Sequence, residues 1–111
     1  MKEIPITSFR NLKIGQAENT AAGTGCTVFL LGQEGAPAGL DVRGGGPASR
    51  ESELLKPLAA AQVIHAIVLA GGSAFGLDAA GGVMRYLEER GIGLMLGSQR
   101  CRWSASRTCL T

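Results

Sequence analysis

The segment that most limits the fold is Val63 to Ala70 (VIHAIVLA), which is followed at once by the glycine turn GGSAFG. The eight residues are apolar except His65, a pattern typical of a central strand covered on both faces. After the turn, apolar side chains recur at spacings of three and four, as on one side of a helix: Leu77, Ala80, Met84 and Leu87. A strand, a glycine turn and a helix in this order predict an α/β (α+β) fold with the helix packed on a sheet.

Residues with special backbone preferences set the expected helix ends. Ser73 is a natural N-cap, Asp78 falls in the first turn, and Gly91 stands where a glycine commonly follows a helix. The pair Gly81 and Gly82 destabilises a helix by about 1 kcal/mol per residue relative to alanine. We therefore expect another backbone to approach the helix closely there, chiefly through helix-to-sheet packing.

Upstream of this unit the sequence predicts a β-hairpin. Its strands are Cys26 to Leu31 (CTVFLL) and Ala38 to Arg43 (AGLDVR), joined through Gln33 to Pro37. Gly44 to Pro47 reads as a loop, and Ser49 to Lys56 as a short helical turn that ends at Pro57.

Charge and composition exclude several classes of partner and cofactor. The net charge of +2 is too small to predict a nucleic-acid or membrane surface. No apolar run is long enough for a membrane span, and no signal-peptide core follows the N-terminus, so we expect a cytoplasmic protein. The three cysteines lack CxxC spacing, so neither a disulfide framework, a metal site nor a cofactor is indicated.

The glycine turn fails the tests for common catalytic and nucleotide-binding motifs. Leu77 stands where a P-loop needs lysine, GGSAFG does not form GxGxxG, and Phe75 stands where a nucleophile elbow needs glycine. We therefore interpret Ser73 as a cap or ligand-facing hydroxyl and His65 as a core histidine. Backbone N–H groups of such a turn can still hold negative charge.

Three segments carry a family resemblance: residues 14–30, 38–55 and 65–93, with DVRGG and GGSAFGLDAA in that order. Together they resemble the N-terminal region of the L-aminopeptidase/D-esterase family, the DmpA-type N-terminal-nucleophile peptidases. The resemblance implies part of an αββα sandwich, incomplete in this chain. It also implies a longer precursor that cuts itself before a serine and then releases N-terminal residues from short peptides, amides or esters without a metal.

The resemblance also implies which residues lie at the substrate. The pocket-lining positions carried over are Gly71, Gly72, Ser73, Phe75 and Gly76. Some family members have a tyrosine where Phe75 stands, with its hydroxyl near the oxyanion, and Phe75 lacks that donor.

Two further positions, Arg43 and Gly44, are carried over only as a family turn. The family's nucleophilic serine lies beyond this sequence, and Ser98 is not assigned to that role. We therefore expect no catalytic residue in this chain, no activity from it alone, and a homo-oligomer in the full-length protein.

The resemblance stops after Gly93, which divides the chain into a peptidase part, residues 1–93, and a tail, residues 94–111. The tail contains Arg100, Arg102 and Arg107 and no acidic residue. Restoring one T in the codon of Leu94 gives FDVGVA(A/T)VPVV, close to the family's continuation FDVGVA-x-VPIV. We therefore hypothesise a frameshifted, unstructured tail that ends at a premature stop, which sequencing of the source DNA would check.

Two other functions remain open on the sequence. The chain can be a small complete α/β module whose glycine turn holds a phosphate or carboxylate. It can also be a non-catalytic subunit that completes its sandwich with a partner chain.

Overall fold

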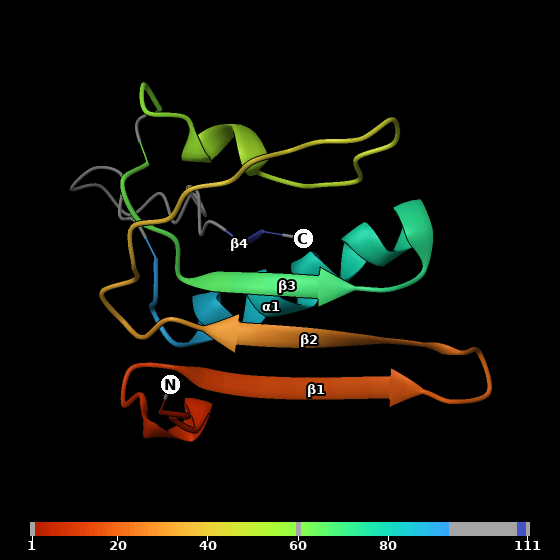
Figure 1. Ribbon diagram of the computed structural model, residues 1–111, viewed down its shortest axis with the longest axis horizontal. Helices are drawn as coiled ribbons and strands as arrows, with labels where there is room; N and C mark the ends of the chain where they lie inside the picture. Colours follow the sequence, from red (N-terminus) through yellow and green to blue (C-terminus); the bar gives the residue numbers. More distant parts are fainter. Residues whose placement is uncertain (1, 60, 94–108, 111) are drawn as a thin grey trace.

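The computed structural model describes residues 2–59, 61–93 and 109–110. Within these residues, four strands, one α-helix and three short 3-10 helices follow one another (Figure 1). In order they are η1 (Ile6–Ser8), β1 (Lys13–Asn19), β2 (Thr24–Leu30), η2 (Ser52–Leu55), β3 (Ala66–Ala70), η3 (Ser73–Asp78), α1 (Ala79–Glu89) and β4 (Cys109–Leu110).

The strands form one mixed sheet in the order β1-β2-β3-β4. β1, β2 and β3 are antiparallel neighbours, whereas β4 pairs parallel to β3 over two residues. The expected strand at 63–70 is confirmed by β3, which lies inside the sheet, and Ile64 just before it bridges to Ala36. These elements form the mixed α/β fold that the sequence predicts.

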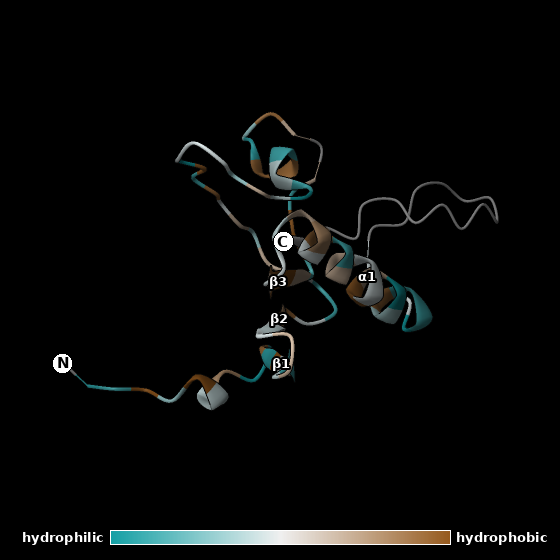
Figure 2. Cartoon of the chain, turned by 90° about the vertical axis from the view of Figure 1, so that its right-hand side faces the viewer, coloured by the Kyte–Doolittle hydropathy of each residue, from teal (hydrophilic) through white to brown (hydrophobic). Residues whose placement is uncertain are grey.

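The described core lies between α1 and one face of the sheet (Figure 2). Ala66 and Val68 of β3 are fully buried against Ala80 and Leu87 of α1. These two helix residues belong to the apolar stripe read from the sequence, which is therefore confirmed as the packing side. We call this side of the sheet the helix face.

The end of α1 follows the sequence prediction closely. Gly91 has a φ of 65°, and its N–H donates to the carbonyl oxygen of Glu88 at 3.0 Å. The N–H of Ile92 donates to the carbonyl oxygen of Leu87 at 2.9 Å, and Ile92 packs against the core. This pair of bonds is the Schellman arrangement that a C′ glycine permits.

The opposite side of the sheet, which we call the open face, has no α-helix packed on it among the described residues (Figure 2). Alternation along β3 puts Ile67 and Leu69 on this side, and the pairing register adds Phe29 and Ile14. Leu69 is 57% exposed and Ile14 is 41% exposed. The expectation that β3 is covered on both faces is therefore wrong for the described part of the chain.

The predicted hairpin is wrong in its second strand. β2 does pair as a hairpin, but with β1 before it, while 38–43 contains no strand. Every residue of β1 is exposed. Its sequence, KIGQAEN, accordingly does not alternate between apolar and polar residues in the way that marks a half-buried strand. The turn expected at 49–56 is confirmed by η2.

Two expectations for the start and middle of the helix are also wrong. Ser73 has a φ of 58° and lies inside η3, which has no side-chain cap bond, whereas a capping residue is extended. A Cβ added at Gly82 meets no described atom within 4 Å, and one at Gly81 meets only Asp78 Oδ1 at 3.8 Å. No described backbone therefore approaches these two glycines.

Most of the tail, residues 94–108 and 111, lies outside the described residues. The two tail residues that the structure describes, Cys109 and Leu110, form β4, which pairs with Ala66 and Ile67 of β3. The proposed frameshift is not tested by the fold.

Candidate functional site

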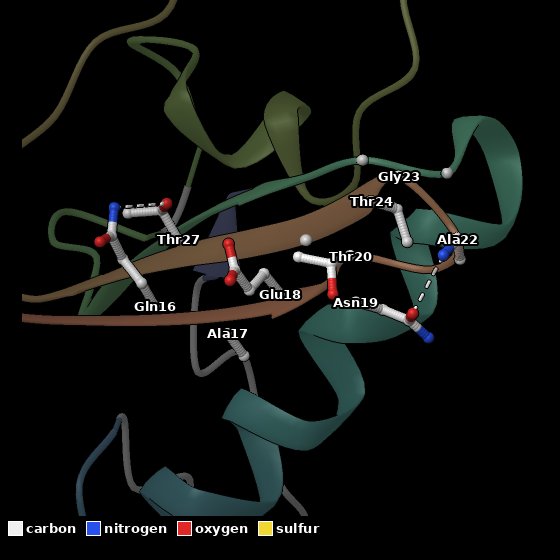
Figure 3. Close-up of a pocket in the computed structure, with 12 residues that line it drawn as sticks. Gln16, Ala17, Glu18, Asn19, Thr20, Ala22, Gly23, Thr24 and Thr27 are labelled. Carbon is white, nitrogen blue, oxygen red and sulfur yellow. Dashed lines mark hydrogen bonds between the residues drawn. The ribbon is translucent and has the colours of Figure 1, made fainter.

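An open pocket of about 880 Å³ lies where the β1–β2 hairpin ends beside the turn that leaves β3 (Figure 3). It opens on segments far apart in the sequence, which the pairing of β2 with β3 brings together. Its lining residues are Gln16, Ala17, Glu18, Asn19, Thr20, Ala22, Gly23, Thr24, Gly25, Thr27, Gly71 and Gly72. We call it the hairpin pocket.

Local hydrogen bonds fix the hairpin end that forms one wall of the pocket. Asn19 Oδ1 accepts from the backbone N–H of Ala22 at 3.0 Å, as the dashed line in Figure 3 shows. The N–H of Gly23 donates to the carbonyl oxygen of Thr20 at 3.3 Å, and Gly23 has a φ of 62°. An asparagine side chain and a left-handed glycine are the residues that such a turn needs.

The second wall is the glycine turn, which packs directly on the hairpin. The N–H of Gly71 donates to the carbonyl oxygen of Gly25 at 2.9 Å. A Cβ added at Gly71 would lie 2.7 Å from Thr24 Oγ1, and one at Gly76 would overlap the carbonyl oxygen of Gly71. A side chain at Gly71 would push against the hairpin wall at Thr24, and one at Gly76 would force the glycine turn itself to shift, so the observed turn requires glycine at position 76.

The turn also carries backbone strain. Gly72 has a φ of 98°, and the next residue, Ser73, has a φ of 58°. A left-handed conformation outside glycine costs on the order of 1 kcal/mol, and such residues cluster at functional sites. The strain at Ser73 therefore agrees with a functional turn rather than with a helix cap.

The pocket is lined by one acidic side chain and otherwise by neutral groups. Glu18 is the charged residue among the described lining residues, and no lysine or arginine joins it. Gln16 Nε2 donates to Thr27 Oγ1 at 3.3 Å on the same wall. A carboxylate with neutral donors and acceptors favours a cationic or neutral ligand over an anion, which weakens the anion-binding interpretation.

The structure brings only part of the predicted site to this pocket. Gly71 and Gly72 line it, whereas Ser73, Phe75 and Gly76 follow in η3 without lining it. Phe75 is 92% exposed. These three positions stay predictions for the substrate pocket.

The predicted family turn lies elsewhere. Arg43 and Gly44 belong to an exposed loop, where Arg43 Nε lies 2.6 Å from Asp41 Oδ2. Gly44 has a φ of 104°, which supports a turn that favours glycine. Neither residue lines the hairpin pocket.

Sequence reasoning missed the hairpin wall, and with it Gln16 and Glu18. The one local signal for that wall is the pair of glycines around Thr24, which is typical of a turn before a strand. Nothing in KIGQAEN indicates which side chains share a cavity, because that depends on the register with β2.

The described residues hold no group of three or more histidine, cysteine, aspartate or glutamate side chains that could bind a metal ion. None of the helices in this part of the chain has the length and hydrophobicity of a membrane span.

Known proteins resemble this chain along most of its length. An uncharacterized aminopeptidase of Mycobacterium tuberculosis is 39% identical over 100 residues, which are 84% of this chain and 29% of that protein. An uncharacterized aminopeptidase of Mycobacterium leprae is 42% identical over 101 residues, 83% of this chain and 28% of that protein. The chain thus spans less than a third of these relatives.

The family comparison agrees with the resemblance read from the sequence. A family model described as peptidase family S58 matches residues 5–107, so the match extends beyond Gly93. The chain belongs to peptidase family S58.

Proposed function

We propose that the chain forms the amino-group-binding part of an aminopeptidase that removes N-terminal residues from short peptides, amides or esters. The membership in peptidase family S58 and the printed names of the relatives support this class of reaction. The chain covers less than a third of those relatives, so the reaction is assigned to the longer protein.

The carboxylate of Glu18 in the hairpin pocket is the observation that carries this proposal. A peptide N-terminus has a pKa of about 8 and is mostly protonated at neutral pH. An ammonium group pairs well with a carboxylate and with neutral acceptors, whereas a basic wall would repel it. The lining has that composition, with Gln16, Asn19 and the threonines around Glu18.

The remaining parts of the reaction follow from N-terminal-nucleophile chemistry. A serine hydroxyl attacks the carbonyl carbon while a terminal amine accepts its proton. The tetrahedral intermediate then needs hydrogen-bond donors, which a glycine turn can supply. We place this serine, and the self-cleavage that exposes it, in the part of the protein beyond residues 1–93, so this chain alone should not hydrolyse substrate.

The experiment compares two substrates with one leaving group: alanine p-nitroanilide, with a free amine, and its N-acetyl derivative. A full-length protein carrying residues 1–93 should cleave itself, hydrolyse the free-amine substrate and leave the acetylated one essentially unchanged. The 111-residue chain serves as the inactive control. Equal hydrolysis of both substrates by the full-length protein, or none of either, would overturn the proposal.

A further inference from the structure

The hairpin pocket extends beyond the carboxylate of Glu18 to a second pair of polar side chains, Gln16 and Thr27. Its volume of about 880 Å³ is near the upper end of the range of about 300 to 1,000 Å³ that is common for small-molecule sites. One small amino acid fills only a fraction of that space. The pocket therefore has room for a substrate that continues beyond its N-terminal residue.

The pairing of β1 with β2 arranges these polar groups in two adjacent rows on the open face. In the first row, Glu18 lies opposite Gly25. In the second row, Gln16 lies opposite Thr27. Figure 3 shows Gln16 and Glu18 on one side of β1, with Ala17 on the other. Two residues of a strand span about 6.7 Å, which is therefore the distance between the two rows.

The row at Glu18 has one charge and no opposing side chain. A Cβ added at Gly25 would lie 2.7 Å from the carbonyl oxygen of Ala17, so β2 has no room for a side chain there. The Glu18 carboxylate therefore faces a glycine across the strand pair, which leaves space for the ammonium group of a substrate.

The row at Gln16 is neutral and has both hydrogen-bond donors and acceptors. Gln16 Nε2 donates to Thr27 Oγ1 at 3.3 Å (Figure 3). This bond uses one of the two amide hydrogens of Gln16, and it leaves Gln16 Oε1 as an acceptor and the hydroxyl hydrogen of Thr27 as a donor. A peptide group has one N–H donor and one C=O acceptor, so it can bond to both.

An extended peptide whose ammonium group is held at Glu18 brings its second peptide group to the Gln16 row. Each residue of an extended chain adds about 3.3 to 3.6 Å, so the second peptide group lies about 7 Å from the N-terminus. A dipeptide with a free C-terminus has a carboxylate at that point instead. The carboxylate lacks the N–H donor, and no lysine or arginine among the described lining residues balances its charge near Glu18.

We propose that Gln16 and Thr27 form a second subsite, which binds the peptide group after the second residue of the substrate. This inference rests on the proposed aminopeptidase function and gives it a substrate class. The preferred substrates are tripeptides and dipeptide amides, which have a neutral peptide or amide group at that point, rather than dipeptides with a free carboxylate.

Three substrates test the second subsite in a full-length protein carrying residues 1–93: alanine amide, alanylalanine and alanylalanine amide. Alanine amide ends before the Gln16 row, whereas the other two differ only in the group that reaches it. We expect kcat/KM for alanylalanine amide to exceed that for alanylalanine about tenfold, because the carboxylate loses a hydrogen bond and meets the charge of Glu18.

Variants of the pair identify the groups responsible. Thr27→Val keeps the branched shape of the side chain but removes its hydroxyl. It should lower kcat/KM for alanylalanine amide about fivefold more than kcat/KM for alanine amide, as expected for one neutral hydrogen bond. Gln16→Met removes the other member of the pair and should act in the same way, whereas Thr27→Ser, which keeps a hydroxyl, should retain the wild-type preference. Thr7→Val is the matched control at an exposed threonine outside the pocket lining, and it should match the wild type on all three substrates.

Two results would overturn the second subsite and leave the proposed function in place. One is equal kcat/KM for alanylalanine and its amide. The other is an equal effect of Thr27→Val and Gln16→Met on alanine amide and on alanylalanine amide, with the fold intact by circular dichroism. A full-length protein that hydrolyses none of the three substrates would instead overturn the proposed function, and the second subsite with it.

Discussion

The two faces of the sheet are made of similar residues but have different surroundings. On the helix face, Ala66 and Val68 are fully buried under α1, whereas on the open face the neighbouring Leu69 is 57% exposed. Both sets come from one apolar strand. The difference shows that the described residues complete the packing on only one side of β3.

The open face also carries two of the polar side chains that line the hairpin pocket. Alternation along β1 puts Gln16 and Glu18 on the same side as Ile14, so the hairpin pocket adjoins the exposed apolar residues. Relatives more than three times as long supply further chain that can cover such a surface. The helix face is therefore the packed side of the described residues, and the open face is the side left for further contacts.

The sharpest test of this difference compares two leucines. Leu87→Ala removes a side chain that is fully buried under the sheet and should lower the free energy of unfolding by about 3 kcal/mol, through lost burial and the cavity left behind. Leu69→Ala removes a mostly exposed one and should cost about 0.5 kcal/mol. Urea unfolding followed by circular dichroism measures both. Equal losses would mean that the open face is as well packed as the helix face.

The glycine turn connects β3 to α1. One added carbon atom at Gly76 tests the close contact between Gly76 and Gly71. Gly76→Ala should destabilise the fold by about 2 kcal/mol, because the new Cβ overlaps the carbonyl oxygen of Gly71 and the turn must shift. Hydrogen exchange should also show faster exchange of the Gly71 amide, which loses its bond to Gly25. A variant with wild-type stability and exchange would show that the tight glycine turn is not needed for the bond between Gly71 and Gly25 that joins the two walls of the pocket.

A matched alanine on the helix should act in the opposite direction. Gly82→Ala places its Cβ where no described atom lies within 4 Å and removes a flexible residue from α1. We expect stabilisation by about 0.5 to 1 kcal/mol, measured by the same urea titration. A loss of stability would instead reveal the close backbone approach that the sequence suggested.

The strand, turn and helix unit could be predicted because its signals are local. The apolar run before Ala70, the stripe through Leu87 and the glycine at position 91 each constrain their own neighbourhood. Family membership could likewise be predicted from short motifs in the right order. The left-handed conformation of Ser73 could not be predicted, because no local signal distinguishes it from the extended backbone of a helix cap.

The hairpin wall of the pocket could not be predicted because its residues carry no burial pattern. β1 is exposed throughout, so nothing in KIGQAEN distinguishes a strand from a loop, whereas the more apolar AGLDVR predicts a strand that does not form. The role proposed for Glu18 depends on register and on the approach of Gly71, two properties of the folded chain. Residues 94–108 and 111 lie outside the described structure, so the predicted frameshift stays a prediction.

The central claim is that Glu18 on the open face binds the amino group of the substrate, and steady-state kinetics of the full-length protein tests it directly. Glu18→Gln keeps the shape of the side chain but removes its charge. Glu34→Gln, an exposed glutamate outside the pocket lining, is the matched control.

We predict that Glu18→Gln raises KM for alanine p-nitroanilide about tenfold, as expected for the loss of a charged hydrogen bond, with kcat within about twofold. Glu34→Gln should match the wild type. An unchanged KM in Glu18→Gln, with the fold intact by circular dichroism, would contradict the account.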